Sequence, residues 1–193
     1  MPPKVGNSAH VGSWMNKERH RIADALFTAV DEGESLYAIL DGARTFDIPF
    51  RLRSAKVEYD SLYRGRSEEV LWHVAPYLVR CGPDSEFFHW VLEHGWGDSW
   101  GIFLTSRADL EDVRMHLRHF LLVQDEDGKQ LYFRFYDPRV LRAFLPTCTP
   151  EETHQFFGPV RCYLIEAKEP ETLLKFTASR QGAQQEAVPL SIS

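Results

Sequence analysis

The stretch Leu36-Tyr37-Ala38-Ile39-Leu40-Asp41-Gly42 decides the fold. Its apolar residues follow one another without the polar interruptions of a strand that exposes one face, and an Asp-Gly turn pair ends the run. This pattern predicts a strand that is buried on both faces. Such a strand must be covered by other elements, so the stretch predicts the start of a central sheet packed under helices.

The chain before this strand predicts one helix. Between Asn16, a residue suited to an N-cap, and Gly33, apolar residues recur every three or four positions, as on the inner face of an amphipathic helix. Residues 1–15 are rich in Pro, Gly, Ser and Asn, and we expect a flexible N-terminus there.

After the central strand, strand and helix patterns alternate. Apolar runs predict strands at Ala75 to Cys81 and at Ser99 to Leu104. A short helix is expected near Ser67 to Trp72, and Ser85 can cap a helix that ends near Gly95.

The next segment predicts a helix followed by a hairpin. Asp109 to Leu121 has acidic residues at its start and basic residues at its end, which suits the dipole of a helix. Leu121 to Gln124 and Gln130 to Tyr136 flank Asp127-Gly128, and an Asp-Gly pair supplies the positive φ that a tight hairpin needs.

Two helices and a last strand are predicted in the remaining part. Asp137-Pro138 combines an N-cap with a first-turn proline ahead of Val140 to Leu145, and Thr149-Pro150 repeats that signal for a helix that ends at Phe157. Val160 to Glu166 has strand character.

Together these elements predict a single α/β (mixed α+β) domain over residues 16–167, with a mixed central sheet flanked by helices. For residues 168–193 we expect a short helix followed by a loose tail rich in Gln, Ala and Ser.

Composition and charge narrow the class of protein. A length of 193 residues and a hydrophobic content of 44% are ordinary for one soluble domain. The net charge of −6 argues against nucleic acid as a ligand. The three cysteines are odd in number, the N-terminus has no apolar signal region, and no run reaches about 18 apolar residues. We therefore expect a cytoplasmic protein that is not attached to a membrane.

The strongest catalytic motif is Gly97-Asp98-Ser99-Trp100-Gly101, which matches the G-x-S-x-G nucleophile elbow of α/β-hydrolases. An elbow needs a strand before the serine and a helix after it, whereas the patterns here predict a helix before Ser99 and a strand after it. The order of elements therefore argues against catalysis at Ser99.

Other chemistry is weakly supported. His116 and His119 have helical spacing and His89 and His94 lie near a helix end, but no complete metal-binding or phosphate-binding motif occurs, so neither a metal nor a cofactor is predicted. Asp41 follows an apolar run, as Asp137 does, and turn or cap chemistry explains both carboxylates.

Two strings are more specific than these motifs. Gly95 to Leu104 (GWGDSWGIFL) and Phe133 to Leu141 (FRFYDPRVL) together resemble the adaptor, or effector chaperone, family of type VI secretion. Leu36 to Arg44, Ala75 to Val79 and Phe156 to Val160 support the resemblance in order and spacing.

The resemblance implies a cytoplasmic, non-catalytic adaptor that binds the N-terminal part of an effector toxin and the C-terminal part of the VgrG spike protein. Members often carry a further helical lobe after the shared domain, and we expect that lobe to be absent here. Two alternatives stay open: a small serine hydrolase around Ser99, and an immunity protein that neutralises a toxin.

Roles for individual residues follow from their settings. Asp137 is expected to cap the helix opened by Pro138, and Arg139 to pair with a buried carboxylate. Asp137, Pro138 and Arg139 are therefore assigned a structural role, and so are Gly95, Gly97 and Gly101. Trp96, Trp100 and Arg134 are the hypothesised contacts with a partner, because aromatic residues and arginine are enriched where interfaces bind most strongly.

Overall fold

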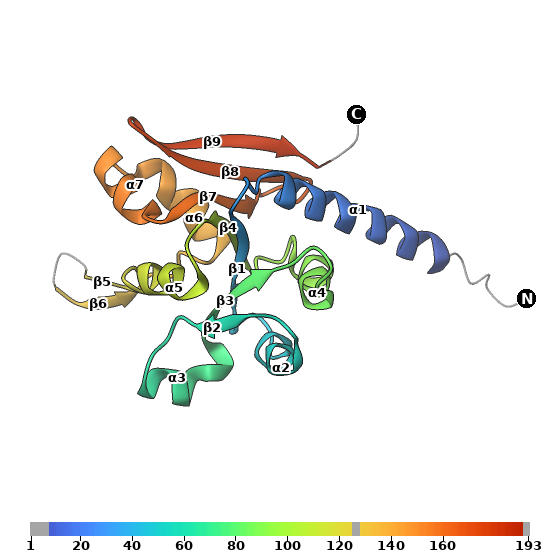
Figure 1. Ribbon diagram of the computed structural model, residues 1–193, viewed down its shortest axis with the longest axis horizontal. Helices are drawn as coiled ribbons and strands as arrows, with labels where there is room; N and C mark the ends of the chain where they lie inside the picture. The colour runs from blue at the N-terminus through green and yellow to red at the C-terminus, as the bar shows by residue number, and fades with distance from the viewer. Residues whose placement is uncertain (1–7, 125–127, 191–193) are drawn as a thin grey trace, which may run out of the picture.

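The structure, a computed structural model, describes residues 8–124 and 128–190 and forms an α+β domain in three layers (Figure 1). A seven-stranded sheet with the order β2-β3-β1-β4-β7-β8-β9 separates helices on its two faces. Its strands are β1 (Ser35–Asp41), β2 (Tyr59–Ser61), β3 (Pro76–Cys81), β4 (Gly101–Ser106), β7 (Val160–Glu166), β8 (Thr172–Ser179) and β9 (Gly182–Pro189). The helices are α1 (Ser8–Thr28), α2 (Asp47–Ser54), α3 (Arg66–Leu71), α4 (Glu86–Gly95), α5 (Leu110–Arg118), α6 (Pro138–Phe144) and α7 (Pro150–Phe157).

The remaining elements are two 3₁₀ turns and a small second sheet. The turns η1 (Trp72–Val74) and η2 (Leu145–Thr147) follow α3 and α6. The second sheet pairs β5 (Leu122–Gln124) with β6 (Gln130–Tyr132). This pairing confirms the predicted hairpin, but its Asp-Gly turn begins at residue 127, and residues 125–127 lie outside the described part of the chain. The second strand is shorter than predicted, because Phe135 and Tyr136 leave the hairpin and enter the core.

The central strand β1 confirms the prediction from its apolar run. Leu36 to Leu40 are all buried, and β1 pairs with β3 on one side and β4 on the other. Side chains that alternate along β1 therefore enter two separate cores, one on each face of the sheet.

Each face of the sheet has its own set of helices. On one face, apolar residues of α1, α2 and α4 pack against Leu36, Ala38 and Leu40. On the other face, apolar residues of α5, α6 and α7 pack against Tyr37 and Ile39. The α+β class with a helix-covered sheet is thus confirmed.

Every pair of strands in the described residues is antiparallel, whereas we expected a mixed sheet. The physical reason lies in the connection from β3 through α4 to β4. These two strands run parallel, as a helical crossover requires, but β1 lies between them and pairs antiparallel with both. The predicted alternation of helices and strands is confirmed, and the insertion of β1 between β3 and β4 makes the pairing antiparallel.

The predicted starts of three helices are present in the structure. The side chains of Ser85, Asp109 and Thr149 accept hydrogen bonds from backbone N–H groups in the first turns of α4, α5 and α7. Thr149 also forms a complete capping box with Glu152. The capping residues therefore mark the starts of these three helices.

The two ends of the domain differ from the prediction. Helix α1 begins at Ser8 rather than at Asn16, and residues 1–7, the rest of the predicted flexible segment, lie outside the described residues. At the other end, the prediction of a short helix and a loose tail is wrong, because β8 and β9 extend the sheet beyond β7. The alternation of Leu174 and Phe176 on one face places β8 on the core, and β9 then pairs with β8.

Candidate functional site

The strings that carry the family resemblance meet at one end of the sheet. Strands β1 and β7 are both antiparallel to β4, so they run parallel to each other and end on the same side. Asp41 ends β1 and Glu166 ends β7, and both carboxylates are buried. The backbone N–H of Asp41 donates to the carbonyl oxygen of Trp100 at 2.8 Å, which joins the end of β1 to the loop before β4.

Two buried aspartates and three arginines form the first half of this site, which we call the arginine–aspartate cluster (Asp41, Asp137, Arg44, Arg134 and Arg139). Arg44 donates from Nη2 to Oδ2 of Asp137 at 2.6 Å, and Arg139 reaches the same carboxylate through Nε at 3.0 Å and Nη2 at 2.7 Å. Arg134 donates to Asp41. The cluster joins the loop after β1 to the start of α6.

Asp137 also builds the helix that follows it. Its carboxylate accepts from the backbone N–H of Arg139 at 3.0 Å, and Pro138 occupies the first turn of α6. Burial alone would raise the pKa of Asp137, but the hydrogen bonds from Arg139 and the charge of Arg44 outweigh it, so this pKa lies below its ordinary value. The carboxylate is therefore a fixed negative charge.

The cluster has an excess of positive charge at the surface. Two carboxylates face three guanidinium groups, and the side chains of Arg134 and Arg139 are 46% and 57% exposed. Each of these arginines uses its guanidinium on an aspartate and still presents N–H groups to the solvent. Arg134, a hypothesised partner contact, is thus positioned by Asp41 and remains accessible.

The second half of the site is the glycine loop, residues 95–101. The carboxylate of Glu166 accepts from the backbone N–H of Gly97 at 2.6 Å, from the backbone N–H of Ser99 at 2.9 Å and from the Ser99 hydroxyl at 3.1 Å. Ser99 has a φ of 57°, a left-handed conformation that aims its N–H at the carboxylate. Burial raises the pKa of Glu166, and these hydrogen bonds offset that effect only in part.

Close packing explains the other two glycines of the loop. A Cβ on Gly95 would lie 2.7 Å from the ring of Trp100, and a Cβ on Gly101 would overlap the carbonyl oxygen of Ile39 in β1. Glycine at these positions lets the loop lie directly on a tryptophan ring and on the central strand.

The tryptophans of the loop are half-buried. Trp96 packs beside Phe103, and its Nε1 donates to the carbonyl oxygen of Pro170 at 2.8 Å. Trp100 packs against Trp90, with 5.2 Å between the ring centroids. We expected the backbone around Trp96 to have little local support, but Glu166 and Pro170 both hold it. These contacts could not be predicted from the sequence, because both residues lie about 70 positions away in the chain.

Ser99 lies in the predicted order of elements, with α4 before it and β4 after it. Its hydroxyl donates a hydrogen bond to the carboxylate of Glu166. Ring nitrogens of His89, His94, His116 and His119 each contact a backbone carbonyl oxygen. Among the residues that the structure describes, no group of three or more His, Cys, Asp or Glu side chains could hold a metal ion.

Sequence reasoning missed an exposed aromatic surface on α2. Phe46 and Phe50 are 66% and 56% exposed, and they contact His73 and Trp72 respectively. Their spacing of four residues places them on one side of the helix. The sequence pattern that could have identified this surface is the Phe46/Phe50 pair, which lies in a segment that otherwise predicts no clear element.

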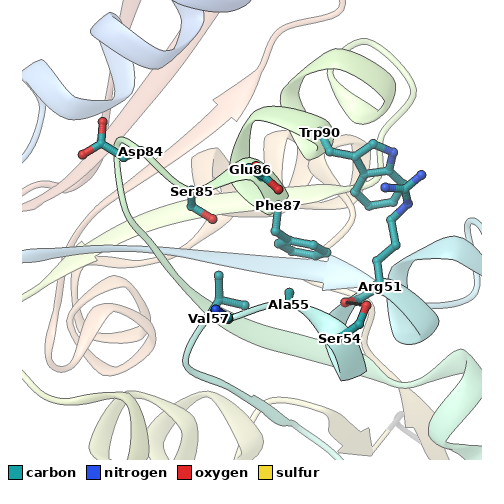
Figure 2. A pocket seen from close by; sticks show the side chains of 10 residues that line it. Arg51, Ser54, Ala55, Val57, Asp84, Ser85, Glu86, Phe87 and Trp90 are labelled. Carbon is teal, nitrogen blue, oxygen red and sulfur yellow. Dashed lines mark hydrogen bonds between the residues drawn. The ribbon is translucent and has the colours of Figure 1, made fainter.

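Two arginines of α2 extend this surface toward clefts on either side of the helix. Arg51 lies 4.5 Å from the ring centroid of Trp90, and Arg53 lies 5.0 Å from that of Trp72. Figure 2 shows Arg51 beside Trp90. Together with Phe87 they line a cleft of 520 Å³ between the end of α2 and the start of α4. We call the six residues Phe46, Phe50, Arg51, Arg53, Trp72 and Trp90 the α2 surface.

The comparisons with known proteins give one match. A family model described as "Domain of unknown function (DUF4123)" matches residues 36–155, which include all of β1 but its first residue, the arginine–aspartate cluster, the glycine loop and the α2 surface. No curated protein and no solved structure gives a significant match. No helix in the described ranges combines the length and the apolar composition of a membrane span.

Proposed function

This chain belongs to the family described as "Domain of unknown function (DUF4123)", and from that premise we propose that it is a non-catalytic adaptor of type VI secretion. In this proposal the protein binds an effector toxin in the cytoplasm and loads it onto the VgrG spike. The strings at Gly95 to Leu104 and Phe133 to Leu141 support the proposal, since they resemble the effector adaptors and lie within the matched domain.

The observation that carries the proposal is the composition of the α2 surface. Tryptophan, phenylalanine and arginine are enriched in protein interfaces, and tryptophan and arginine are also enriched among the residues that contribute most to binding energy. Here two phenylalanines are more than half exposed, and two arginines lie over tryptophan rings. Exposed aromatic residues that lie together on one side of a helix mark interaction sites, so we assign partner binding to α2.

The experiment is affinity copurification of the tagged protein from its native cytoplasm, with mass spectrometry of the retained proteins. We expect a VgrG protein, a large toxin, or both. A Phe50→Ala/Arg53→Ala variant should lose most of the retained partner, because truncation at such sites costs about 2 kcal/mol or more. Met115→Ala is the matched control, since Met115 is 49% exposed on α5 and should leave retention unchanged.

The same experiment tests the glycine loop. Trp96→Ala should weaken retention if the hypothesised contact is correct, and a change below about 0.5 kcal/mol would remove Trp96 from the binding surface. Recovery of neither spike nor toxin with the folded wild type would contradict the adaptor proposal. Retention of a toxin alone, together with rescue of cells poisoned by it, would favour the immunity alternative.

A further inference from the structure

The two edges of the seven-stranded sheet are built differently. One edge is β2, which has only three residues, Tyr59–Ser61. The other edge is β9, which has eight residues and pairs with β8 along its whole length without a bulge. Proteins commonly protect an open edge with a very short strand, an interior proline, a lysine or a bulge. Strand β2 uses the first device. Strand β9 has no lysine and no bulge, its proline is the last residue, and its one charged residue is Glu186.

The free backbone groups of β9 can be assigned from the pairing. Residues of an antiparallel strand alternately direct their N–H and C=O groups toward the paired strand and away from it. The N–H of Leu190 donates to the carbonyl oxygen of Glu171 at 2.8 Å, which fixes the phase of the alternation. The residues whose groups point outward are Ala183, Gln185 and Ala187, and no strand in the described chain pairs with them.

The side chains of β9 favour another strand as the neighbour. Residues 184–187 are exposed on both faces of the sheet, and Glu186 is the only charged residue in the strand. Glu186 lies opposite Lys175 of β8, with 3.6 Å between the charged atoms, so its charge is partly balanced within the domain. A strand whose edge carries little electrostatic repulsion can pair with a second strand.

We propose that β9 pairs antiparallel with β9 of a second copy of this chain, about a twofold axis at Gln185. In this register Gln185 faces Gln185 of the second copy, and Ala183 faces Ala187, so every outward N–H and C=O group of these residues finds a partner. Gln184 then faces Glu186 of the second copy, and its amide can donate to that carboxylate. The edge is therefore complementary to itself, as a twofold interface must be. This inference does not depend on the proposed partners.

The test is sedimentation equilibrium of the full chain over a wide range of concentration. Pairing through one edge buries less surface than a standard stable interface, so we expect a reversible dimer with a dissociation constant on the order of micromolar. Gln185→Pro removes one outward N–H without breaking the ladder to β8 and should weaken the dimer at least about tenfold. Circular dichroism and thermal unfolding establish that this variant is folded.

Charge variants at one exposed position test the register itself. Gln184→Glu places a carboxylate opposite Glu186 of the second copy and should weaken the dimer several-fold, whereas Gln184→Lys should strengthen it by a similar factor. Gln181→Glu adds the same charge in the turn before β9, outside the paired region, and should change the dissociation constant less than about twofold.

Three outcomes would overturn the proposal. They are a wild type that stays monomeric at the highest concentration, a dimer insensitive to Gln185→Pro, and equal shifts from the two Gln184 variants. A monomeric wild type whose copurified partner is lost in Gln185→Pro would instead assign the edge to a strand of that partner.

Discussion

The arginine–aspartate cluster and the glycine loop lie at the same end of the sheet. Each of them binds a buried carboxylate, but with different chemical groups. Asp137 is held by the guanidinium groups of Arg44 and Arg139, whereas Glu166 is held by backbone N–H groups and one hydroxyl. The pKa of Asp137 is lowered and that of Glu166 is raised. Burial raises both pKa values: the contacts of Asp137 with guanidinium groups outweigh it, whereas the hydrogen bonds to Glu166 and the charge of Arg142 offset it only in part.

The comparison also concerns which substitutions each region should tolerate. The loop depends on the shape of its backbone, so it should be sensitive to added atoms. The cluster depends on the balance of charge, so it should be sensitive to the loss of one partner.

The largest effect is expected for Gly101→Ala. The new Cβ would overlap the carbonyl oxygen of Ile39 in the central strand, and neither backbone can move without disturbing the sheet. We expect a loss of about 3 kcal/mol or more in the free energy of unfolding, measured by urea titration. Gly97→Ala is the control, because its Cβ has no contact closer than 3.5 Å, and it should lose only about 1 kcal/mol from its positive φ. Equal losses for the two variants would contradict the packing argument.

Asp137→Ala should have the next largest effect, a loss of about 2–3 kcal/mol. The variant loses the N-cap of α6, leaves Arg139 without its carboxylate and leaves Arg44 with Asp41 alone at 3.6 Å, although both arginines are partly hydrated. Asp137→Asn keeps a side chain that can cap the helix and should lose only about half as much. If the two variants were equally stable in thermal unfolding, the charges would contribute little and the cap would account for the whole effect.

A smaller loss, about 1 kcal/mol, is expected for Ser99→Ala. This variant loses the hydroxyl hydrogen bond to Glu166 and keeps a side chain in the left-handed conformation. Ser99→Gly loses the same hydrogen bond but relieves the backbone, so it should stay close to the wild type. A Ser99→Gly variant that is less stable than Ser99→Ala would show that the positive φ is not strained.

The pH dependence of stability should distinguish the two carboxylates by its sign. Stability from Asp137 is present above its ordinary pKa of 3.8 and is lost as pH falls through the lower pKa of the folded protein. For Glu166, whose pKa is raised above 4.5, stability falls as pH rises from 4.5 through the higher folded value.

Unfolding free energies of the wild type, Asp137→Asn and Glu166→Gln, measured from about pH 3 to about pH 7, test this contrast. Asp137→Asn should flatten the acidic side of the curve, and Glu166→Gln should remove the decrease above pH 4.5. The opposite assignment would mean that the surroundings of the two groups were interpreted wrongly.

Much of the fold could be predicted because its signals are local. The buried run at Leu36 to Leu40 and the caps at Ser85, Asp109 and Thr149 act within a few residues of themselves. The strands β8 and β9 were missed, since the pairing of β9 depends on the edge that β8 presents and its own exposed residues show no clear alternation. The insertion of β1 between β3 and β4 is likewise a property of the assembled sheet.

The candidate site was predicted in part for the same reason. Asp137 acts on the residues next to it, so its role as a cap is visible in the string Asp137-Pro138. Arg134 pairs with Asp41 across 93 positions of the sequence. Gly97 of the glycine loop contacts Glu166 across 69 positions. No periodicity in a single sequence reports such contacts.

The central position of β1 has a consequence for synthesis of the protein. It is the first strand of the described residues to be synthesised, but its neighbours are formed by residues 76–81 and 101–106. During that interval a strand with five consecutive apolar residues has both edges unpaired, and such strands favour aggregation of nascent chains. Folding must therefore wait for distant segments, and we expect it to be slow compared with helical proteins of this size.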